Sequence, residues 1–165
     1  MNPRAVACLK KKSKLNVIQM KQILILCIGN ICRSPIAEYF LASRLSATYP
    51  DVSVRSAGLG ALVGYSADPT SCELMLARGI DLSQHRARQV TAERVFTSDL
   101  ILTMTTEQQE QVEATFSGTR GRVHRLGKWS GFDVSDPYKR PKAIFEQATI
   151  LIEQGLDEWC KKIWN

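Results

Sequence analysis

The sequence lacks most of the features that mark membrane, exported and metal-binding proteins. No apolar run approaches the ~18 residues that a membrane-spanning helix needs, and the basic residues near the start are not followed by the apolar segment of a signal peptide. Histidine is scarce: only His85 and His124 are present, and neither has cysteine or acidic neighbours at the spacing of a zinc site. We therefore expect no membrane span and no metal.

The five cysteines are odd in number and irregularly spaced, at Cys8, Cys27, Cys32, Cys72 and Cys160. This spacing, together with the missing export signal, argues against a disulfide framework. The sequence also contains no CxxC pair. We expect a cytoplasmic protein whose thiols are reduced.

Acidic residues are missing from the first 21 positions, and this accounts for the whole net charge of +6. That segment holds six of the 22 basic residues, which leaves 16 basic against 16 acidic residues in the remainder. A body of balanced charge lacks the basic surface typical of nucleic-acid binding, so we expect no nucleic-acid partner. We interpret residues 1–20 as a basic arm, either flexible or an upstream-start extension, and residues 21–165 as one domain.

Apolar runs alternate with segments of helical periodicity along the chain. The periodic segments predict helices, and strands are predicted at residues 22–28, 51–57, 100–104 and 123–126. This alternation predicts an α/β domain with a four-stranded parallel sheet and helices on both faces. Ligands bind beyond the carboxyl ends of such strands. Cys27, at the end of the first predicted strand, therefore lies where a ligand is expected.

The sequence CIGNICRSP (27–35) joins the first predicted strand to a helix, which we expect to begin with Ser34 as its N-cap and proline next. Backbone N–H groups at such a junction converge on one point, and the helix dipole favours negative charge there. A single cysteine at a strand end is ordinarily a small buried apolar residue. Here glycine, asparagine, arginine and a helix start accompany it, so we interpret the loop as an anion-binding site.

Four residues of this loop suit chemistry at phosphorus. Gly29 lets the backbone approach a ligand closely, and Asn30 tolerates left-handed backbone geometry. Arg33 supplies a planar guanidinium that matches two phosphate oxygens. A cation and a helix N-terminus also stabilise a thiolate, here that of Cys27. One loop thus combines an anion pocket with an ionised nucleophile.

The sequence CIGNICRSP resembles the phosphate-binding loop of the low-molecular-weight protein tyrosine phosphatases. The likeness continues through RSAGLGALVG, DLSQHRARQV, DLILTM and DPYKRP, and covers residues 21–163. GALVG is similar to the bacterial type, which is associated with capsule and exopolysaccharide. The resemblance implies a flavodoxin-like, phosphotyrosine phosphatase I-like fold. It also implies hydrolysis of phosphotyrosine through a cysteinyl-phosphate intermediate, without metal or cofactor.

The resemblance also implies the roles of the site residues. Cys27 is the expected nucleophile, Arg33 the phosphate ligand and Asp136 the general acid, whereas the other Asp-Pro aspartate, Asp68, is expected to cap a helix. The remaining residues of the expected phosphate-binding loop are Ile28, Gly29, Asn30, Ile31, Cys32 and Ser34.

Two further groups of residues follow from the resemblance. Ser56 and His85, with Asn30 and Ser34, are expected to form a polar network behind the loop. Leu62 and Tyr138 are expected to wall a deep slot, which favours phosphotyrosine over the shorter phosphoserine.

Cys32 has two interpretations. It is either a small apolar wall residue or a thiol that forms a reversible disulfide with oxidised Cys27 and so spares it from irreversible oxidation.

Three alternative functions stay open. Arsenate reductases of the same superfamily need cysteines in a segment where this chain, between Gly79 and Gly127, has none. Protein-arginine phosphatases carry threonine where this chain has Ile31. A phosphate-sensing module without turnover would need neither Cys27 nor Asp136. The expected partners are phosphotyrosine proteins, and by analogy a bacterial tyrosine autokinase that governs capsule or exopolysaccharide export.

Overall fold

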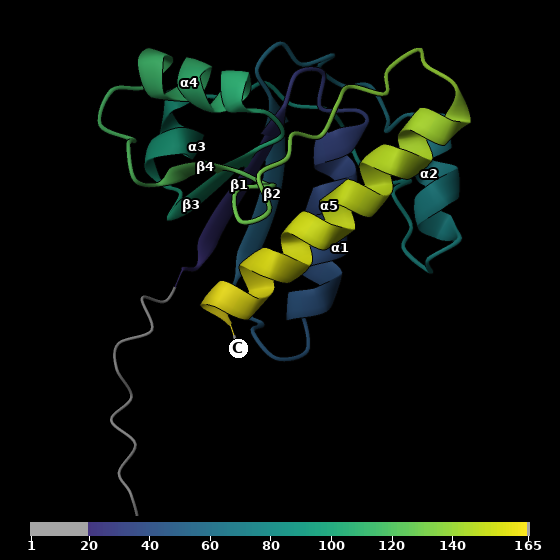
Figure 1. Cartoon of the computed structure of the whole chain (residues 1–165), viewed down its shortest axis with the longest axis horizontal. Helices are drawn as coiled ribbons and strands as arrows, with labels where there is room; N and C mark the ends of the chain where they lie inside the picture. The colour runs from purple at the N-terminus through teal and green to yellow at the C-terminus, as the bar shows by residue number, and fades with distance from the viewer. Residues whose placement is uncertain (1–19, 165) are drawn as a thin grey trace, which may run out of the picture.

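The computed structural model describes residues 20–164, which form an alternating series of strands and helices (Figure 1). Residues 1–19, and with them nearly all of the predicted basic arm (1–20), lie outside the described residues. The elements in chain order are β1 (Gln22–Cys27), α1 (Arg33–Leu45), β2 (Ser53–Gly58), α2 (Pro69–Leu76), α3 (Ala92–Phe96), β3 (Leu100–Thr103), α4 (Thr106–Thr115), β4 (Val123–Arg125) and α5 (Lys142–Ile163).

The four strands form one parallel sheet in the order β2-β1-β3-β4. The chain leaves β1 toward β2 on one side and later returns to β3 on the other, so the strand order reverses next to β1. Crevices at such reversal points, beyond the carboxyl ends of the strands, are where open α/β sheets bind ligands. Cys27 is the last residue of β1 and is paired in register with Gly58 of β2.

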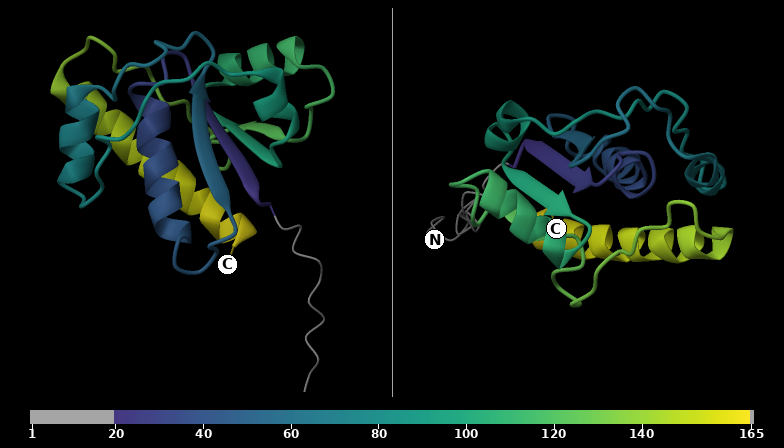
Figure 2. Two further views of the ribbon diagram at one scale, coloured as in Figure 1. Left: turned by 180° about the vertical axis from the view of Figure 1, so that it is seen from behind. Right: turned by 90° about the horizontal axis from the view of Figure 1, so that it is seen from above.

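Helices cover both faces of the sheet, as predicted. Alternate residues of β1 explain this, because successive side chains of a strand point to opposite faces. Ile23 and Ile25 pack in one cluster with the apolar faces of α1 and α5, and Leu24 and Leu26 pack in another with α3 and α4. The left panel of Figure 2 shows the sheet between these two groups of helices. No helix formed by residues 20–164 combines the length and apolar character needed to cross a membrane.

The short helix α3 was not predicted from the sequence. Its five residues, AERVF, are too few to show a helical repeat, and only Val95 is buried. A local signal was nevertheless present, because the Thr91 side chain accepts a hydrogen bond from the Arg94 N–H and caps the helix. The predicted cap at Asp68 is confirmed: its carboxylate accepts from the Thr70 N–H at 2.8 Å, with Pro69 at the first helical position.

Candidate active site

The loop between β1 and α1 lies at the carboxyl edge of the sheet. β1 ends at Cys27 and α1 begins at Arg33, so residues 28–32 connect a buried strand directly to a helix N-terminus. Gly58, at the end of β2, lets the neighbouring backbone approach this loop, because a Cβ there would lie 2.3 Å from the carbonyl oxygen of Ile28. The packing of β2 against the loop therefore requires glycine at this position.

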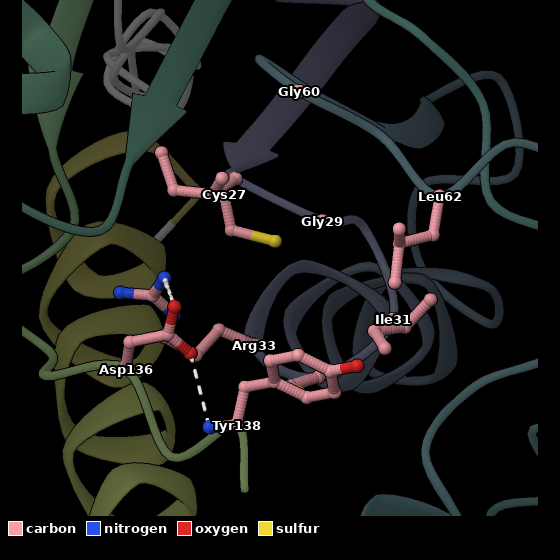
Figure 3. A pocket seen from close by; sticks show the side chains of 10 residues that line it. Cys27, Gly29, Ile31, Arg33, Gly60, Leu62, Asp136 and Tyr138 are labelled. Atoms are coloured by element: carbon pink, nitrogen blue, oxygen red, sulfur yellow. Dashed lines mark hydrogen bonds and ion pairs between the residues drawn. The ribbon is translucent and has the colours of Figure 1, made fainter.

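A cavity of about 150 Å³ opens on this loop (Figure 3). The three predicted catalytic residues, Cys27, Arg33 and Asp136, all line it. The predicted wall residues Leu62 and Tyr138 also line it. The remaining lining residues are Ile28, Gly29, Ile31, Cys32 and Gly60. Of these only Gly60 was not predicted, because it has no side chain to indicate a role and, unlike Gly29, does not belong to the loop that follows Cys27.

Asn30 organises the loop from behind the cavity. It is fully buried and has φ of 57°, a left-handed conformation that asparagine tolerates better than most residues. Its amide nitrogen donates to the hydroxyls of Ser34 and Ser56, both at 2.8 Å. Its amide oxygen accepts from the Arg88 N–H at 2.9 Å, so the side chain ties the loop to α1, β2 and the segment that contains Arg88.

Ser34 links this network to the sulfur of Cys27. Its hydroxyl oxygen lies 2.9 Å from the Cys27 Sγ. Because that oxygen already accepts from Asn30, its own proton is free to be donated to the sulfur. The prediction of Ser34 as the N-cap is wrong: α1 begins at Arg33, with Cys32 at the N-cap position and no side-chain cap. The hydroxyl serves the sulfur instead of the helix terminus.

Glu38 is a member of the network that the sequence analysis missed. Its side chain is buried, and its carboxylate accepts a short hydrogen bond from the Ser56 hydroxyl. The available signal was its spacing, because residues four apart on a helix share a face, and Glu38 follows Ser34 by four. A carboxylate on a buried helix face needs a polar partner, and Ser56 supplies it.

Arg33 joins the loop to the segment that carries Asp136. Its buried guanidinium donates through one terminal nitrogen to the Val134 carbonyl at 2.9 Å and pairs through the other with the Asp136 carboxylate at 3.1 Å. The third nitrogen, Nε, is buried and has no hydrogen-bond partner within residues 20–164. A buried donor without a partner is costly, and a phosphate oxygen is the kind of acceptor that would satisfy it.

The Asp136 carboxylate has a second contact, which is the ordinary one for an aspartate before proline. It accepts from the Tyr138 N–H at 3.1 Å and so forms a turn of its own (Figure 3). Its side chain is half exposed. The turn therefore holds the carboxylate at the mouth of the cavity while leaving it accessible to solvent and to a ligand.

Comparisons with known proteins decide the family. The sequence profile of the family "Low molecular weight phosphotyrosine protein phosphatase" matches residues 22–165. The chain belongs to this family. A curated relative from Ralstonia nicotianae, "Probable low molecular weight protein-tyrosine-phosphatase EpsP", is 46% identical over 144 residues, which are 87% of this chain and 97% of the relative.

Two solved structures of tyrosine phosphatases share the fold of this chain. The tyrosine phosphatase amsI of Erwinia amylovora has a TM-score of 0.82 at 35% identity and covers 88% of this chain and 95% of its own. Vibrio vulnificus Wzb, solved in complex with benzylphosphonate, has a TM-score of 0.80 at 34% identity and covers 87% of this chain and 99% of its own. The predicted four-stranded, flavodoxin-like fold is confirmed.

Cys32 lies in the wall of the cavity, which Cys27 also lines. Burial raises the pKa of its thiol, and the nearby carboxylate of Asp68 raises it further. Cys32 is therefore a neutral thiol at ordinary pH, which suits a wall residue. The disulfide with Cys27 stays a prediction. Among residues 20–164, no group of three or more His, Cys, Asp or Glu side chains could hold a metal ion.

His85 supports the phosphatase loop through the backbone of Asn30. Its Nε2 lies 2.7 Å from the Asn30 carbonyl oxygen, and since a carbonyl only accepts, Nε2 carries the proton and donates. Its Nδ1 is buried without a hydrogen-bond partner and lies 3.9 Å from the Glu38 carboxylate. Burial lowers the pKa of His85 below 6.5, although the Asn30 carbonyl and Glu38 oppose the decrease.

This lowered pKa predicts a loss of stability in acid. Between the folded and unfolded pKa values the unfolded chain binds the extra proton, so the free energy of unfolding falls as pH drops below about 6.5. The slope is at most about 1.4 kcal/mol per pH unit for each histidine. Urea unfolding of His85→Gln, from about pH 8 to about pH 5, is expected to show a shallower decline.

His124 provides the matched comparison, because burial, helped by the charge of Lys128, also lowers its pKa. His124→Gln is expected to remove the part of the decrease in unfolding free energy that is due to His124. The double variant is expected to remove the contributions of both histidines. If His85→Gln declines as steeply as the unsubstituted protein, His85 is not held neutral in the fold.

Proposed function

We propose that this phosphatase hydrolyses phosphotyrosine in proteins, with Cys27 as nucleophile, Arg33 as phosphate ligand and Asp136 as proton donor. One observation carries the proposal. Three groups border the same cavity: a sulfur 2.9 Å from a serine hydroxyl, a buried guanidinium whose Nε has no hydrogen-bond partner among residues 20–164, and an accessible carboxylate. Binding a phosphate requires only the guanidinium and the loop; the thiol and the carboxylate are needed for turnover.

In the first step the Cys27 thiolate attacks phosphorus in line with the bond to the tyrosine oxygen. The loop N–H groups and Arg33 hold the three equatorial phosphate oxygens, whose charge the preorganised donors stabilise. Asp136 donates its proton to the departing tyrosine oxygen as the P–O bond breaks. A phosphate on Arg33 takes the place that Asp136 holds in this structure, so substrate binding itself frees the carboxyl group.

In the second step water attacks the cysteinyl-phosphate. The Asp136 carboxylate accepts a proton from this water, and the S–P bond breaks to return the thiolate. The Ser34 hydroxyl, oriented by Asn30, donates to the sulfur as negative charge returns to it. The polar network behind the loop therefore supports the departure of the sulfur in this step.

The walls of the cavity support an aromatic substrate. Leu62 and Tyr138 present apolar surface on two sides of the space above Cys27 (Figure 3). Such a slot grips a phenyl ring and requires a long side chain to reach the sulfur, which favours phosphotyrosine over phosphoserine. The relatives named above come from bacteria. Their origin supports a bacterial tyrosine autokinase, which acts in capsule or exopolysaccharide export, as the protein that supplies the phosphotyrosine. The phosphatase would meet this partner in the cytoplasm.

A peptide panel tests this function. Phosphate release from matched phosphotyrosine, phosphoserine and phosphoarginine peptides is measured with the unsubstituted protein and with Cys27→Ser. We expect turnover of phosphotyrosine alone, abolished by the substitution. An autophosphorylated bacterial tyrosine kinase, used as substrate in the same assay, tests the partner.

The other outcomes of the panel are equally informative. Faster phosphoarginine turnover assigns the protein to the arginine phosphatases. It would also show that Ile31 does not distinguish tyrosine from arginine phosphatases. Absence of turnover on every peptide, with phosphate binding equal in Cys27→Ser, identifies a binding module.

A further inference from the structure

Three segments beyond the helix residue Arg33 line the cavity, and they differ in charge. The loop at residues 27–32 and the whole segment 57–67, which includes Gly60 and Leu62, contain no charged residue. The third rim segment, DPYKRPK (136–142), carries three cations. Of these three segments, only DPYKRPK presents cations to a charged group beside the phosphotyrosine, and its one acid, Asp136, is paired with Arg33.

Lys139 is held at the rim by its backbone. The Arg140 N–H donates to the Pro137 carbonyl at 2.9 Å and closes a turn, in which Lys139 has φ of 58°. Within residues 20–164 only Asn30 shares a positive φ among non-glycine residues, and the phosphate loop explains that one. The Lys139 ammonium lies 5.3 Å from the ring centroid of Tyr138, the wall residue, and the lysine is exposed to solvent.

Two of the three cations are available to a ligand. Lys142 is already paired, since its ammonium lies 2.6 Å from the Glu73 carboxylate of α2. Lys139 and Arg140 form no ion pair with any acidic residue among residues 20–164, and both are exposed. The nearest acid along the chain, Asp136, is engaged by Arg33.

We infer that Lys139 and Arg140 select phosphotyrosine sites that are flanked by acidic residues. This rests on the proposed phosphotyrosine hydrolysis and adds to it a substrate class. A tyrosine whose ring lies against Tyr138 brings its neighbouring residues to the exposed face of that wall, where the ammonium of Lys139 lies. The other two lining segments, 27–32 with its exposed Ile28 and 57–67, carry no charge of their own.

The expected effect is modest, because the ion pairs form in contact with solvent. Exposed pairs contribute about 0.2–1 kcal/mol, which corresponds to about 1.5- to 5-fold in kcat/KM for each charge. Dissolved salt screens the attraction between these charges, because the Debye length falls from about 30 Å at 0.01 M to about 3 Å at 1 M ionic strength. The preference for acidic substrates is therefore expected to weaken steadily as salt is added.

The experiment compares three phosphotyrosine peptides of one core, flanked by glutamate, alanine or lysine. We expect kcat/KM to decrease in that order. Lys139→Gly and Arg140→Ala are each expected to lower the glutamate-to-alanine ratio about 1.5- to 5-fold. Lys139→Gly suits the test because glycine accepts the left-handed conformation without strain, so thermal unfolding at an unchanged or higher temperature shows that the fold is intact.

Two control variants separate local from general charge effects. Lys139→Arg keeps the cation and is expected to keep the ratio. Lys161→Ala removes a cation from the far end of α5 and is expected to leave the ratio unchanged.

Equal kcat/KM on the three peptides, or a preference that survives the double variant Lys139→Gly/Arg140→Ala, overturns the inference while the phosphatase activity stands. Failure to hydrolyse any phosphotyrosine peptide overturns the proposed function itself.

Discussion

Replacing Asp136 with asparagine is expected to lower kcat on phosphotyrosine peptides about 10²- to 10⁴-fold, the usual contribution of a positioned general acid. Asparagine can still accept from the Tyr138 N–H, so the turn is kept while the transferable proton is lost. The KM is expected to stay equal or to fall, because a neutral amide competes less well than a carboxylate for Arg33.

The leaving group provides the sharper measurement. A phenol with an electron-withdrawing substituent departs without much help from a proton donor, so the deficit of Asp136→Asn on p-nitrophenyl phosphate is expected to be far smaller than on phosphotyrosine. The two substrates share the phosphate and the nucleophile. A deficit of equal size on both would therefore assign Asp136 to binding or structure rather than to proton donation.

The second Asp-Pro pair supplies the matched control. Asp68 caps α2 through the Thr70 N–H, and asparagine is an equally good capping residue. Asp68→Asn is expected to leave both kcat and the free energy of unfolding nearly unchanged. Loss of activity in Asp68→Asn with retention in Asp136→Asn would reverse the two assignments.

Replacing Asn30 with alanine is expected to lower the free energy of unfolding by about 2–4 kcal/mol and to reduce kcat. The side chain donates to Ser34 and Ser56, and its loss leaves the half-buried Arg88 N–H without its partner, which costs about 1–2 kcal/mol, the lower part of the range for a buried donor. Alanine must in addition adopt the left-handed conformation at φ of 57°, which costs about 1–2 kcal/mol.

Glycine separates these two contributions. Asn30→Gly loses the same hydrogen bonds without the backbone strain, so it is expected to be about 1 kcal/mol more stable than Asn30→Ala. Urea unfolding measures both variants, and rapid-quench kinetics follow the cysteinyl-phosphate. Its accumulation is expected in both, because Ser34 is no longer oriented toward the sulfur. Equal free energies of unfolding for the two variants would mean that the left-handed backbone conformation costs alanine nothing. If Asn30→Gly is as stable as the unsubstituted protein, the hydrogen bonds of Asn30 do not contribute to stability.

Much of this protein was determined by its sequence alone, because the decisive features are local. The phosphate loop occupies a few consecutive residues between β1 and α1, so the spacing from Cys27 to Arg33 already places the sulfur and the guanidinium at one helix N-terminus. The alternation of apolar runs and helical repeats predicted the sheet with helices on both faces. The cap at Asp68 was likewise predicted, since the two partners of its hydrogen bond are two residues apart.

The tertiary structure alone decided which distant groups meet at that loop. Arg33 contacts the Val134 carbonyl 101 residues away, and Glu38 meets the Ser56 hydroxyl from 18 residues away. Local patterns carry no information on such distances, which depend on how the strands are ordered and how closely the helices pack. For the same reason Ser34, a good cap by its position in the sequence, does not cap the helix. In the folded chain its oxygen accepts from the buried Asn30 amide, and this contact orients its hydroxyl toward the Cys27 sulfur.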